Sequence, residues 1–190
     1  MSKRALVVIA DGTEEIEAVT VIDVLRRATV DVCVASCQLT QELQIKASRG
    51  VKLVADSHID ECVDYSFDLI VLPGGMPGAE HLRDCPTLTT MLTCQQKAER
   101  WIAAICAAPA VVLSAHNLIA NAKATCHPAF LQQLQAKQVV SDQTVVVDEK
   151  HALITSQGPG TAMIFALKLV EILMGEKKAQ EVGQPMVLLS

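Results

Sequence analysis

The chain has 190 residues, of which 51% are hydrophobic and 19% are charged, and its formal net charge is −5. This length and composition predict one globular domain, residues 1–190, that buries a sizeable core. Basic residues are scattered and only 3% of the residues are aromatic, so the sequence offers neither a positive stripe nor a stacking surface for bases. These features argue against nucleic acid as a partner.

Targeting and redox signals favour a cytoplasmic protein. Lys3 and Arg4 precede an apolar run, as in a signal peptide, but the run ends after residue 10 at Asp11 and Gly12. No other run approaches the length that spans a bilayer, so we expect no membrane partner. The seven cysteines lack paired spacing, which predicts free thiols in a reducing compartment, and no spacing typical of a metal site is present.

The apolar pattern opens with a βαβ unit. Residues 5–10 form a continuous apolar run typical of a buried strand, and the alternating valines of residues 30–34 predict a second strand. Residues 14–28 between them predict a helix. Apolar residues of that helix recur every three positions, at Ile16, Val19, Ile22 and Leu25.

Later segments continue the alternation of strands and helices. This order predicts an α/β fold with a doubly wound, mostly parallel sheet covered by helices on both faces. In such sheets, ligands bind at the carboxyl ends of the strands. The expected strands are residues 43–45 and 51–55, as a short antiparallel excursion, then 69–72, 102–105, 122–126, a β-rich stretch over 139–147, and 152–155; the expected helices are 87–100, one that begins at 107, 161–174 and 177–182.

Cys106 is the residue that most strongly suggests chemistry. It follows an apolar strand, and Ala107, Ala108 and Pro109 read as the first turn of a helix, where proline is tolerated. A thiol at a helix N-terminus experiences partial positive charge, so we expect Cys106 to ionise below the free-thiol value of about 8.5 and to be the most reactive of the seven cysteines. The alternative is a buried cysteine that acts as a small hydrophobe.

Other polar or flexible residues also follow predicted strands. Gly74 and Gly75 could present backbone N–H groups to an anion or simply form a turn. Glu17 lies in the first helical turn, where a carboxylate can merely complement the helix dipole, and His127 could be an ordinary loop residue. Their shared placement at one sheet edge favours function, because a cysteine nucleophile needs a neighbour that manages its proton.

Five stretches make the sequence resemble the ThiJ/PfpI superfamily of flavodoxin-like proteins along nearly its whole length, and most closely the branch of the Parkinson-associated DJ-one and bacterial YajL proteins. The resemblance implies a homodimer with Cys106 as nucleophile and Glu17 hydrogen-bonded to its sulfur. The stretches are KRALVVIADGTEEIEAV (3–19), ASRGVKLVAD (47–56), DLIVLPGG (68–75), AAICAAPAVVL (103–113) and TSQGPGTA (155–162).

The resemblance also implies further site residues. It places His127 beside the pocket and assigns the backbone N–H groups of Gly75 and Ala107 as donors. It places three charged residues near the pocket or the dimer interface: Glu14, Arg27 and Arg49.

Departures from related branches narrow the expected function. Ala107 stands where the protease branch has histidine after the cysteine, and Ile105 and Ala107 do not match the glycines that flank the cysteine of glutamine amidotransferases. Gln157 replaces an arginine often found before the GPGT loop. We therefore expect a cofactor-independent deglycase or glyoxalase that acts on oxoaldehydes such as methylglyoxal or on their early protein adducts. The alternatives are a redox-regulated chaperone or sensor that oxidises Cys106, and an interaction protein with an inert cysteine.

Overall fold

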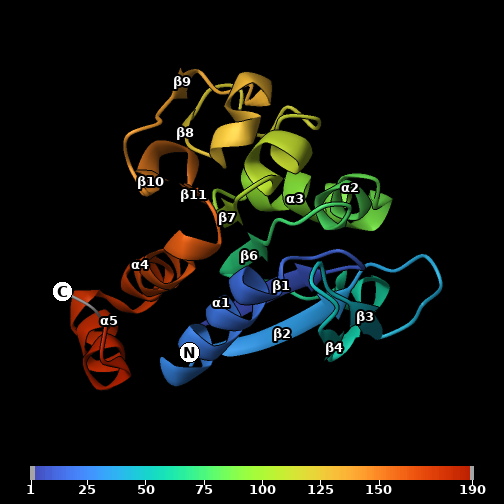
Figure 1. Cartoon of the computed structure of the whole chain (residues 1–190), viewed down its shortest axis with the longest axis horizontal. Helices are drawn as coiled ribbons and strands as arrows, with labels where there is room; N and C mark the ends of the chain where they lie inside the picture. Colours follow the sequence, from blue (N-terminus) through green and yellow to red (C-terminus); the bar gives the residue numbers. More distant parts are fainter. Residues whose placement is uncertain (1–2, 189–190) are drawn as a thin grey trace.

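The computed structural model describes residues 3–188 and has a seven-stranded sheet at its centre (Figure 1). The strand order is β10–β11–β7–β6–β1–β2–β5, and every neighbouring pair is parallel except β10 and β11. This confirms the predicted doubly wound, flavodoxin-like sheet. Its strands are β1 (Arg4–Ile9), β2 (Asp31–Ser36), β5 (Ser57–His58), β6 (Leu69–Leu72), β7 (Trp101–Ile105), β10 (Val145–Asp148) and β11 (Leu153–Ser156).

Two smaller ladders lie outside the main sheet. The predicted antiparallel excursion is confirmed as the pair β3 (Gln44–Lys46) and β4 (Lys52–Val54). The second ladder is the parallel pair β8 (Lys123–Ala124) and β9 (Gln138–Val139). The stretch over residues 139–147, expected to be rich in β-structure, therefore divides between β9 and β10.

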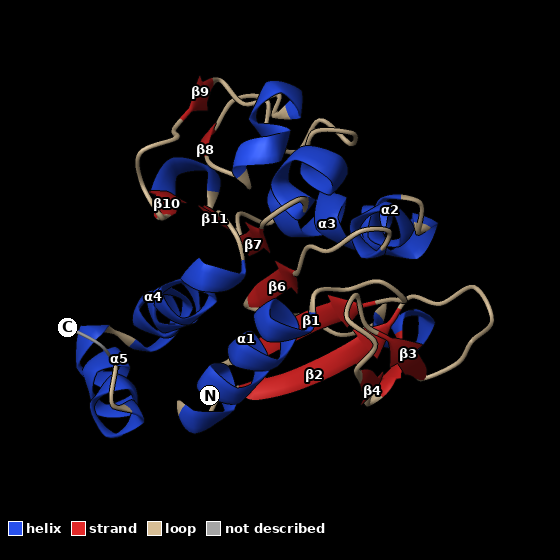
Figure 2. Ribbon diagram, viewed as in Figure 1, coloured by secondary structure: helices blue, strands red, loops and turns tan. Residues whose placement is uncertain are grey.

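Helices cover both faces of the main sheet (Figure 2). Helices α1 and α4 pack together on one face with α5 beside α4, whereas α2 and α3 lie on the other face. The α-helices are α1 (Glu15–Arg27), α2 (Gly78–Arg83), α3 (Pro86–Lys97), α4 (Ala162–Met174) and α5 (Glu176–Gly183). One π-helical turn, η2 (Pro109–Leu113), and five 3₁₀ segments complete the list: η1 (Ile59–Cys62), η3 (Pro128–Gln133), η4 (Glu149–His151), η5 (Pro159–Thr161) and η6 (Gln184–Met186).

The strand order creates a crevice at one edge of the sheet. From β1 the chain first adds β2 on one side and later returns to add β6 on the other side. The connections that leave β1 and β6 therefore diverge, and in open α/β sheets ligands bind at this point. The loop after β1 leads into α1, and Gly74 and Gly75 follow β6.

The buried face of α1 differs from the face that its sequence suggests. Val21 and Val24 are fully buried, whereas Ile16 is 54% and Val19 is 45% exposed. The three-residue repeat therefore predicts the helix correctly but its inward face only in part, because Leu25 is fully buried whereas Ile16 and Val19 face solvent. The surplus apolar face is the one that carries Ile16 and Val19.

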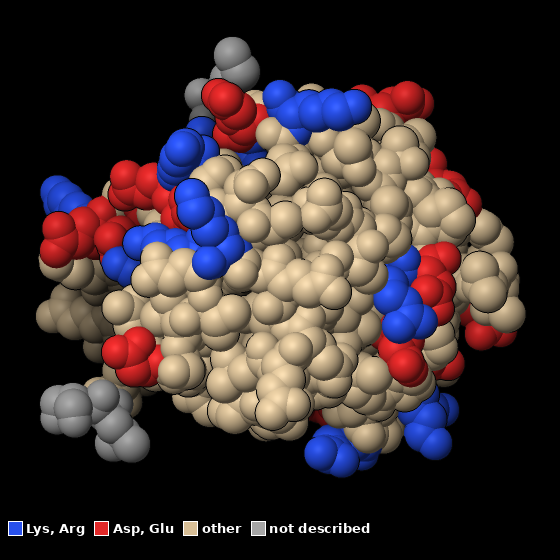
Figure 3. Space-filling view, turned by 90° about the horizontal axis from the view of Figure 1, so that it is seen from above, with Lys and Arg blue, Asp and Glu red and all other residues tan. Residues whose placement is uncertain are grey.

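Charged groups on the surface are mixed in sign. Figure 3 views one face from above, where Lys and Arg side chains lie beside Asp and Glu around the margin, and most of the centre carries neither. Within residues 3–188, no helix is both long enough and apolar enough to cross a membrane.

Candidate active site

Cys106 occupies a strained bend directly after β7. Its φ angle is 65°, a left-handed conformation that is unusual for a residue with a side chain. The backbone is fixed on both sides: the Cys106 N–H donates to the Ser156 carbonyl at 3.0 Å, and the Cys106 carbonyl accepts from the His127 N–H at 2.8 Å. Strain that is held in this way is typical of functional sites. The predicted helix after Cys106 is only the short η2 turn.

Glu17 is buried beneath this bend. It lies in the first turn of α1, where the Glu14 carboxylate caps the helix by accepting the Glu17 N–H at 2.8 Å. The Glu17 side chain is fully buried, and its Oε2 accepts the Gly74 N–H at 2.7 Å. Burial raises the pKa of Glu17 from 4.5 to about 7, although the hydrogen bonds from Gly74 and Cys106 oppose the shift. A carboxyl group that only complemented the helix dipole would face solvent.

Cys106 and Glu17 form a coupled pair. Within the described residues, Glu17 Oε1 is buried and has no hydrogen-bond partner, and the neighbouring Cys106 thiol lowers the pKa of this carboxyl group. Burial and the charge of Glu17 raise the pKa of Cys106 to about 12. The expectation of a thiol pKa below about 8.5 is therefore wrong for Cys106 beside an ionised Glu17, because desolvation and like charge outweigh the local N–H dipoles.

Two backbone N–H groups face the sulfur. Those of Gly75 and Ala107 favour the thiolate form of Cys106 and oppose the rise in its pKa. Gly75 has a φ angle of 90°, which favours glycine, and a Cβ on Gly74 would lie 2.6 Å from the Cys106 Cβ. Gly74 is thus required by its close approach to Cys106, whereas Gly75 is required by its positive φ and by its close approach to the loop after β1, where an added Cβ would meet the backbone of residues 12–14.

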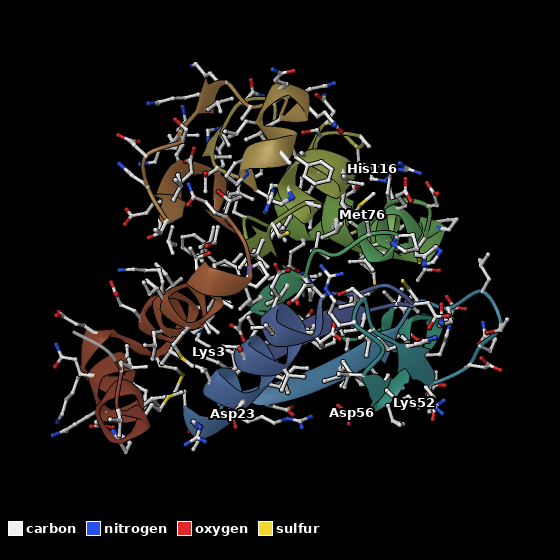
Figure 4. The ribbon with its side chains drawn as sticks, in the orientation of Figure 1. Lys3, Asp23, Lys52, Asp56, Met76 and His116 are labelled. Atoms are coloured by element: carbon white, nitrogen blue, oxygen red, sulfur yellow. The ribbon has the colours of Figure 1, made fainter. Side chains whose placement is uncertain are left out.

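A cavity of about 370 Å³ opens above Cys106. Predicted residues from five separate segments line it with Cys106: Glu14, Arg49, Gly75, Ala107 and His127. Sequence reasoning missed Ser48, Met76, Phe130 and Pro159, which also line the cavity, because none carries a pattern beyond its local turn. Figure 4 labels Met76 on the connection between β6 and α2.

His127 forms part of the wall of this cavity. Its Nδ1 accepts the Ala129 N–H at 3.2 Å and so caps η3. Its ring meets the Phe130 ring edge to face, with centroids 6.2 Å apart. Because Nδ1 is an acceptor here, the neutral ring carries its proton on Nε2. His127 is therefore placed to donate a hydrogen bond to a bound ligand.

Two predicted site residues lie outside the cavity. Arg27 is at the far end of α1, is half-exposed and pairs with Asp23 at 2.6 Å, so of its two expected places the pocket is excluded and the dimer interface stays a prediction. Gly74 does not line the cavity either, and its N–H instead binds Glu17.

The loop before α4 also serves the site. The Thr161 hydroxyl makes no cap hydrogen bond to α4; it contacts Ser156 Oγ at 2.7 Å and accepts the Gly158 N–H at 3.1 Å. These bonds close the loop on itself and hold Pro159 at the cavity. Among residues 3–188, no group of three or more His, Cys, Asp or Glu residues is arranged to hold a metal ion.

Comparisons with known proteins agree with this architecture. Residues 3–172 match the model of the DJ-1/PfpI family. The chain is 44% identical to protein DJ-1 homolog B of Arabidopsis thaliana, and the match covers 98% of this chain and 42% of that protein. The chain thus spans about half the length of the first curated relatives that it matches. It is 36% identical to the Caenorhabditis elegans glutathione-independent glyoxalase DJR-1.2, covering 98% of this chain and 97% of that protein.

Solved structures extend the agreement to the fold. The structure of oxidized Toxoplasma gondii DJ-1 superposes with a TM-score of 0.94 at 40% identity, and the match covers 100% of both chains. The match of the family model to residues 3–172, together with relatives that are well above 30% identical over nearly the whole chain, establishes that this chain belongs to the DJ-1/PfpI family.

Proposed function

We propose that this chain is a cofactor-independent glyoxalase or deglycase that converts oxoaldehydes such as methylglyoxal, or their early adducts with protein thiols and amines, through a covalent bond to Cys106. The observation that carries the proposal is the Cys106–Glu17 pair, set below a cavity of about 370 Å³ and faced by two backbone N–H groups. A buried acid beside a thiol is suited to proton exchange at neutral pH, because the pKa of Glu17 is about 7. The related nematode protein that is named a glutathione-independent glyoxalase supports the reaction class.

The first step forms a hemithioacetal. The Cys106 sulfur attacks the aldehyde carbon of methylglyoxal as Glu17 takes the thiol proton, a C–S bond forms, and the carbonyl π pair moves to oxygen. The Gly75 and Ala107 N–H groups, which face the sulfur, stabilise the negative charge on that oxygen until Glu17 returns the proton to it. Arg49 and His127 on the cavity wall would orient the second carbonyl of the substrate.

The second step is an internal redox reaction. Glu17 removes the proton from the former aldehyde carbon, and the electron pair moves toward the neighbouring ketone. Glu17 then returns a proton to the former ketone carbon, so that one carbon is oxidised to a thioester and the other is reduced to an alcohol. Water hydrolyses the thioester, which releases lactate and restores the thiol. No external oxidant or reductant is consumed.

The test is lactate formation from methylglyoxal without added glutathione. We expect turnover by the wild-type protein and none by Cys106→Ser. Cys94→Ser is the matched control, because Cys94 is exposed and lies outside the cavity. Full activity of Cys106→Ser, or none in the wild-type protein, would refute the proposal.

A second candidate function is redox sensing or redox-regulated chaperone activity at the same cysteine. The N–H groups of Gly75 and Ala107 and a protonated Glu17 are also suited to hold a Cys106 sulfinate. The related Toxoplasma gondii protein was solved in an oxidized form. Peroxide-dependent sulfinate formation at Cys106 without methylglyoxal turnover would favour this function over the enzyme.

We also propose a cytoplasmic homodimer. All seven cysteines are free thiols, which fits a reducing compartment. The exposed apolar side chains Ile16 and Val19 on α1 and Ile164 on the adjacent α4 provide a face for an isologous interface. Sedimentation should give a dimer at micromolar concentration that Val19→Asp weakens, whereas a wild-type monomer would refute the interface.

A further inference from the structure

A second pair of sulfur atoms lies at the β5 edge of the main sheet. Cys33 in β2 and Cys62 at the end of η1 have their Sγ atoms 3.9 Å apart. The hydroxyl of Ser57 contacts both, at 3.6 Å from Cys33 Sγ and 3.4 Å from Cys62 Sγ. Three segments of the chain therefore converge on one small polar cluster.

This cluster is separate from the Cys106 cavity. Cys33 pairs in register with Leu6 in the middle of β1, whereas Cys106 lies beyond the carboxyl end of β7. Neither Cys33 nor Cys62 lines the cavity above Cys106. The proposed chemistry of Cys106 does not use this pair.

The two thiols have different access to solvent. Cys33 is partly exposed, whereas Cys62 is 2% exposed. A small oxidant can therefore reach Cys33 first, with Cys62 held directly behind it. The surface around η1 is accessible, because Asp60, Glu61 and Val63 are exposed.

The polar neighbours also favour ionisation of Cys33. Its pKa is lowered, first by the hydrogen bond from Cys62 and further by the hydroxyl of Ser57, with Arg4 assisting and Asp56 opposing. The pKa of Cys62 is raised in turn by its hydrogen bond to Cys33 and by burial. Figure 4 labels Asp56 near the outer edge of the sheet, where it accepts the Val34 N–H at 2.9 Å. Because the thiolate is the nucleophile, Cys33 is the attacking member of the pair.

We propose that Cys33 and Cys62 form a second redox site, in which a hydroperoxide oxidises Cys33 and Cys62 resolves the product into a reversible intramolecular disulfide. The geometry that carries the proposal is the 3.9 Å approach of a partly exposed sulfur to a buried one at an accessible sheet edge. A disulfide needs an S–S distance near 2.05 Å, so the two sulfurs must approach by about 2 Å.

The reaction consumes one hydroperoxide per disulfide. The Cys33 thiolate attacks a peroxide oxygen, an S–O bond forms as the O–O bond breaks, and the leaving hydroxide takes the proton that Cys33 lost, which gives water and a sulfenic acid. Cys62 Sγ then attacks the sulfenic sulfur, an S–S bond forms as the S–O bond breaks, and the hydroxyl leaves as water with the proton of Cys62. Two thiols are oxidised and the peroxide is reduced. An external thiol reverses the step by exchange.

The test uses hydrogen peroxide on the full chain with Cys106→Ser, so that the proposed site thiol does not compete. After the remaining thiols are blocked, unreduced digestion and mass spectrometry should show the peptide that joins Cys33 to Cys62 as the main disulfide. Dithiothreitol should abolish it, and two thiols should be lost per peroxide consumed. Adding Cys94→Ser, a change at an exposed cysteine outside the cluster, should leave the cross-link unchanged.

Two variants separate the roles within the pair. Cys62→Ala should stop the reaction at a sulfenic acid on Cys33 that dimedone captures, and Cys33→Ser should leave Cys62 unoxidised. The proposal is overturned if both thiols survive peroxide, if Cys33 joins a different cysteine or another molecule, or if both are oxidised separately to sulfinic acids.

Discussion

Cys106 and Cys33 place the same chemical group in two different surroundings. Cys106 lies over a buried carboxyl group, and burial together with the charge of Glu17 raises its pKa to about 12. Cys33 lies beside a thiol and a hydroxyl, which donate hydrogen bonds and lower its pKa. A negatively charged neighbour raises the pKa of a thiol, so a proton stays on the pair. A neutral hydrogen-bond donor stabilises the thiolate and lowers the pKa of the thiol.

This contrast assigns different chemistry to the two regions. The Cys106–Glu17 pair loses its first proton near pH 7. Above that pH one proton remains on the pair and can move between the Glu17 carboxyl oxygen and the Cys106 sulfur. That arrangement suits a reaction that both removes and returns a proton. At Cys33 the groups that contact the sulfur are the Ser57 hydroxyl and the Cys62 thiol, and Cys62 favours formation of a disulfide instead.

The largest expected effect comes from Glu17→Gln. The amide still donates a hydrogen bond toward the sulfur but cannot exchange protons, so oxoaldehyde turnover should fall by about 10² to 10⁴. Peroxide should still oxidise Cys106, and the Cys33–Cys62 pair should be unaffected. Glu17→Ala, which also removes the donor, should in addition change sulfinate accumulation at Cys106. Wild-type turnover in Glu17→Gln would exclude Glu17 as the acid and base.

The same substitution should change how stability depends on pH. The folded protein holds the Glu17 proton more tightly than the unfolded chain, because the pKa rises from 4.5 to about 7. The contribution of Glu17 to the free energy of unfolding is therefore fully present below pH 4.5, and about 3 kcal/mol of it is lost as the pH rises to about 7. Denaturant titrations across this window should show the fall in the wild-type protein and its loss in Glu17→Gln. Parallel curves for the two proteins would contradict a buried, proton-holding Glu17.

A smaller effect should follow from Gly74→Ala. The new Cβ would lie 2.6 Å from the Cys106 Cβ, so the bend must shift. We expect a loss of about 1 to 3 kcal/mol in stability and of about 10² in turnover. Gly160→Ala is the matched control, because its Cβ meets nothing within 4 Å. Equal behaviour of the two variants would show that close approach at Gly74 does not position the thiol.

The sequence predicts the succession of strands and helices along the chain, and it predicts that the site lies at the carboxyl ends of the strands. Continuous apolar runs identify the buried parallel strands, and two of these runs are followed by residues that line the cavity, Gly75 after β6 and Cys106 after β7. The helix α2 escapes prediction because its six residues are too few to show a period. Which face of α1 is buried also escapes, because apolar residues lie on more than one face of the helix and only the tertiary packing decides between them.

The electrostatics of the site are harder to predict than its location. The position of Cys106 before a helical turn suggests a lowered pKa, whereas the structure shows that burial and Glu17 reverse the sign. Desolvation depends on which segments cover a group, and Glu17 looks like an ordinary first-turn acid until Gly74 is seen to bind it. Arg27 likewise belongs to the same helix as Glu17, but it lies in the last turn, at the end opposite to the cavity.

The central claim is that Cys106 and Glu17 share one proton at neutral pH. It is tested most directly by the rate of iodoacetamide alkylation at Cys106, mapped by mass spectrometry between about pH 5 and pH 10, in the wild-type protein and in Glu17→Gln. In the wild-type protein the rate should rise through an inflection near 7, the pKa of Glu17, and then level off. Glu17→Gln should lose that inflection and rise only at higher pH, as its thiol ionises alone. An inflection near pH 7 in both proteins, or in neither, would contradict the shared proton.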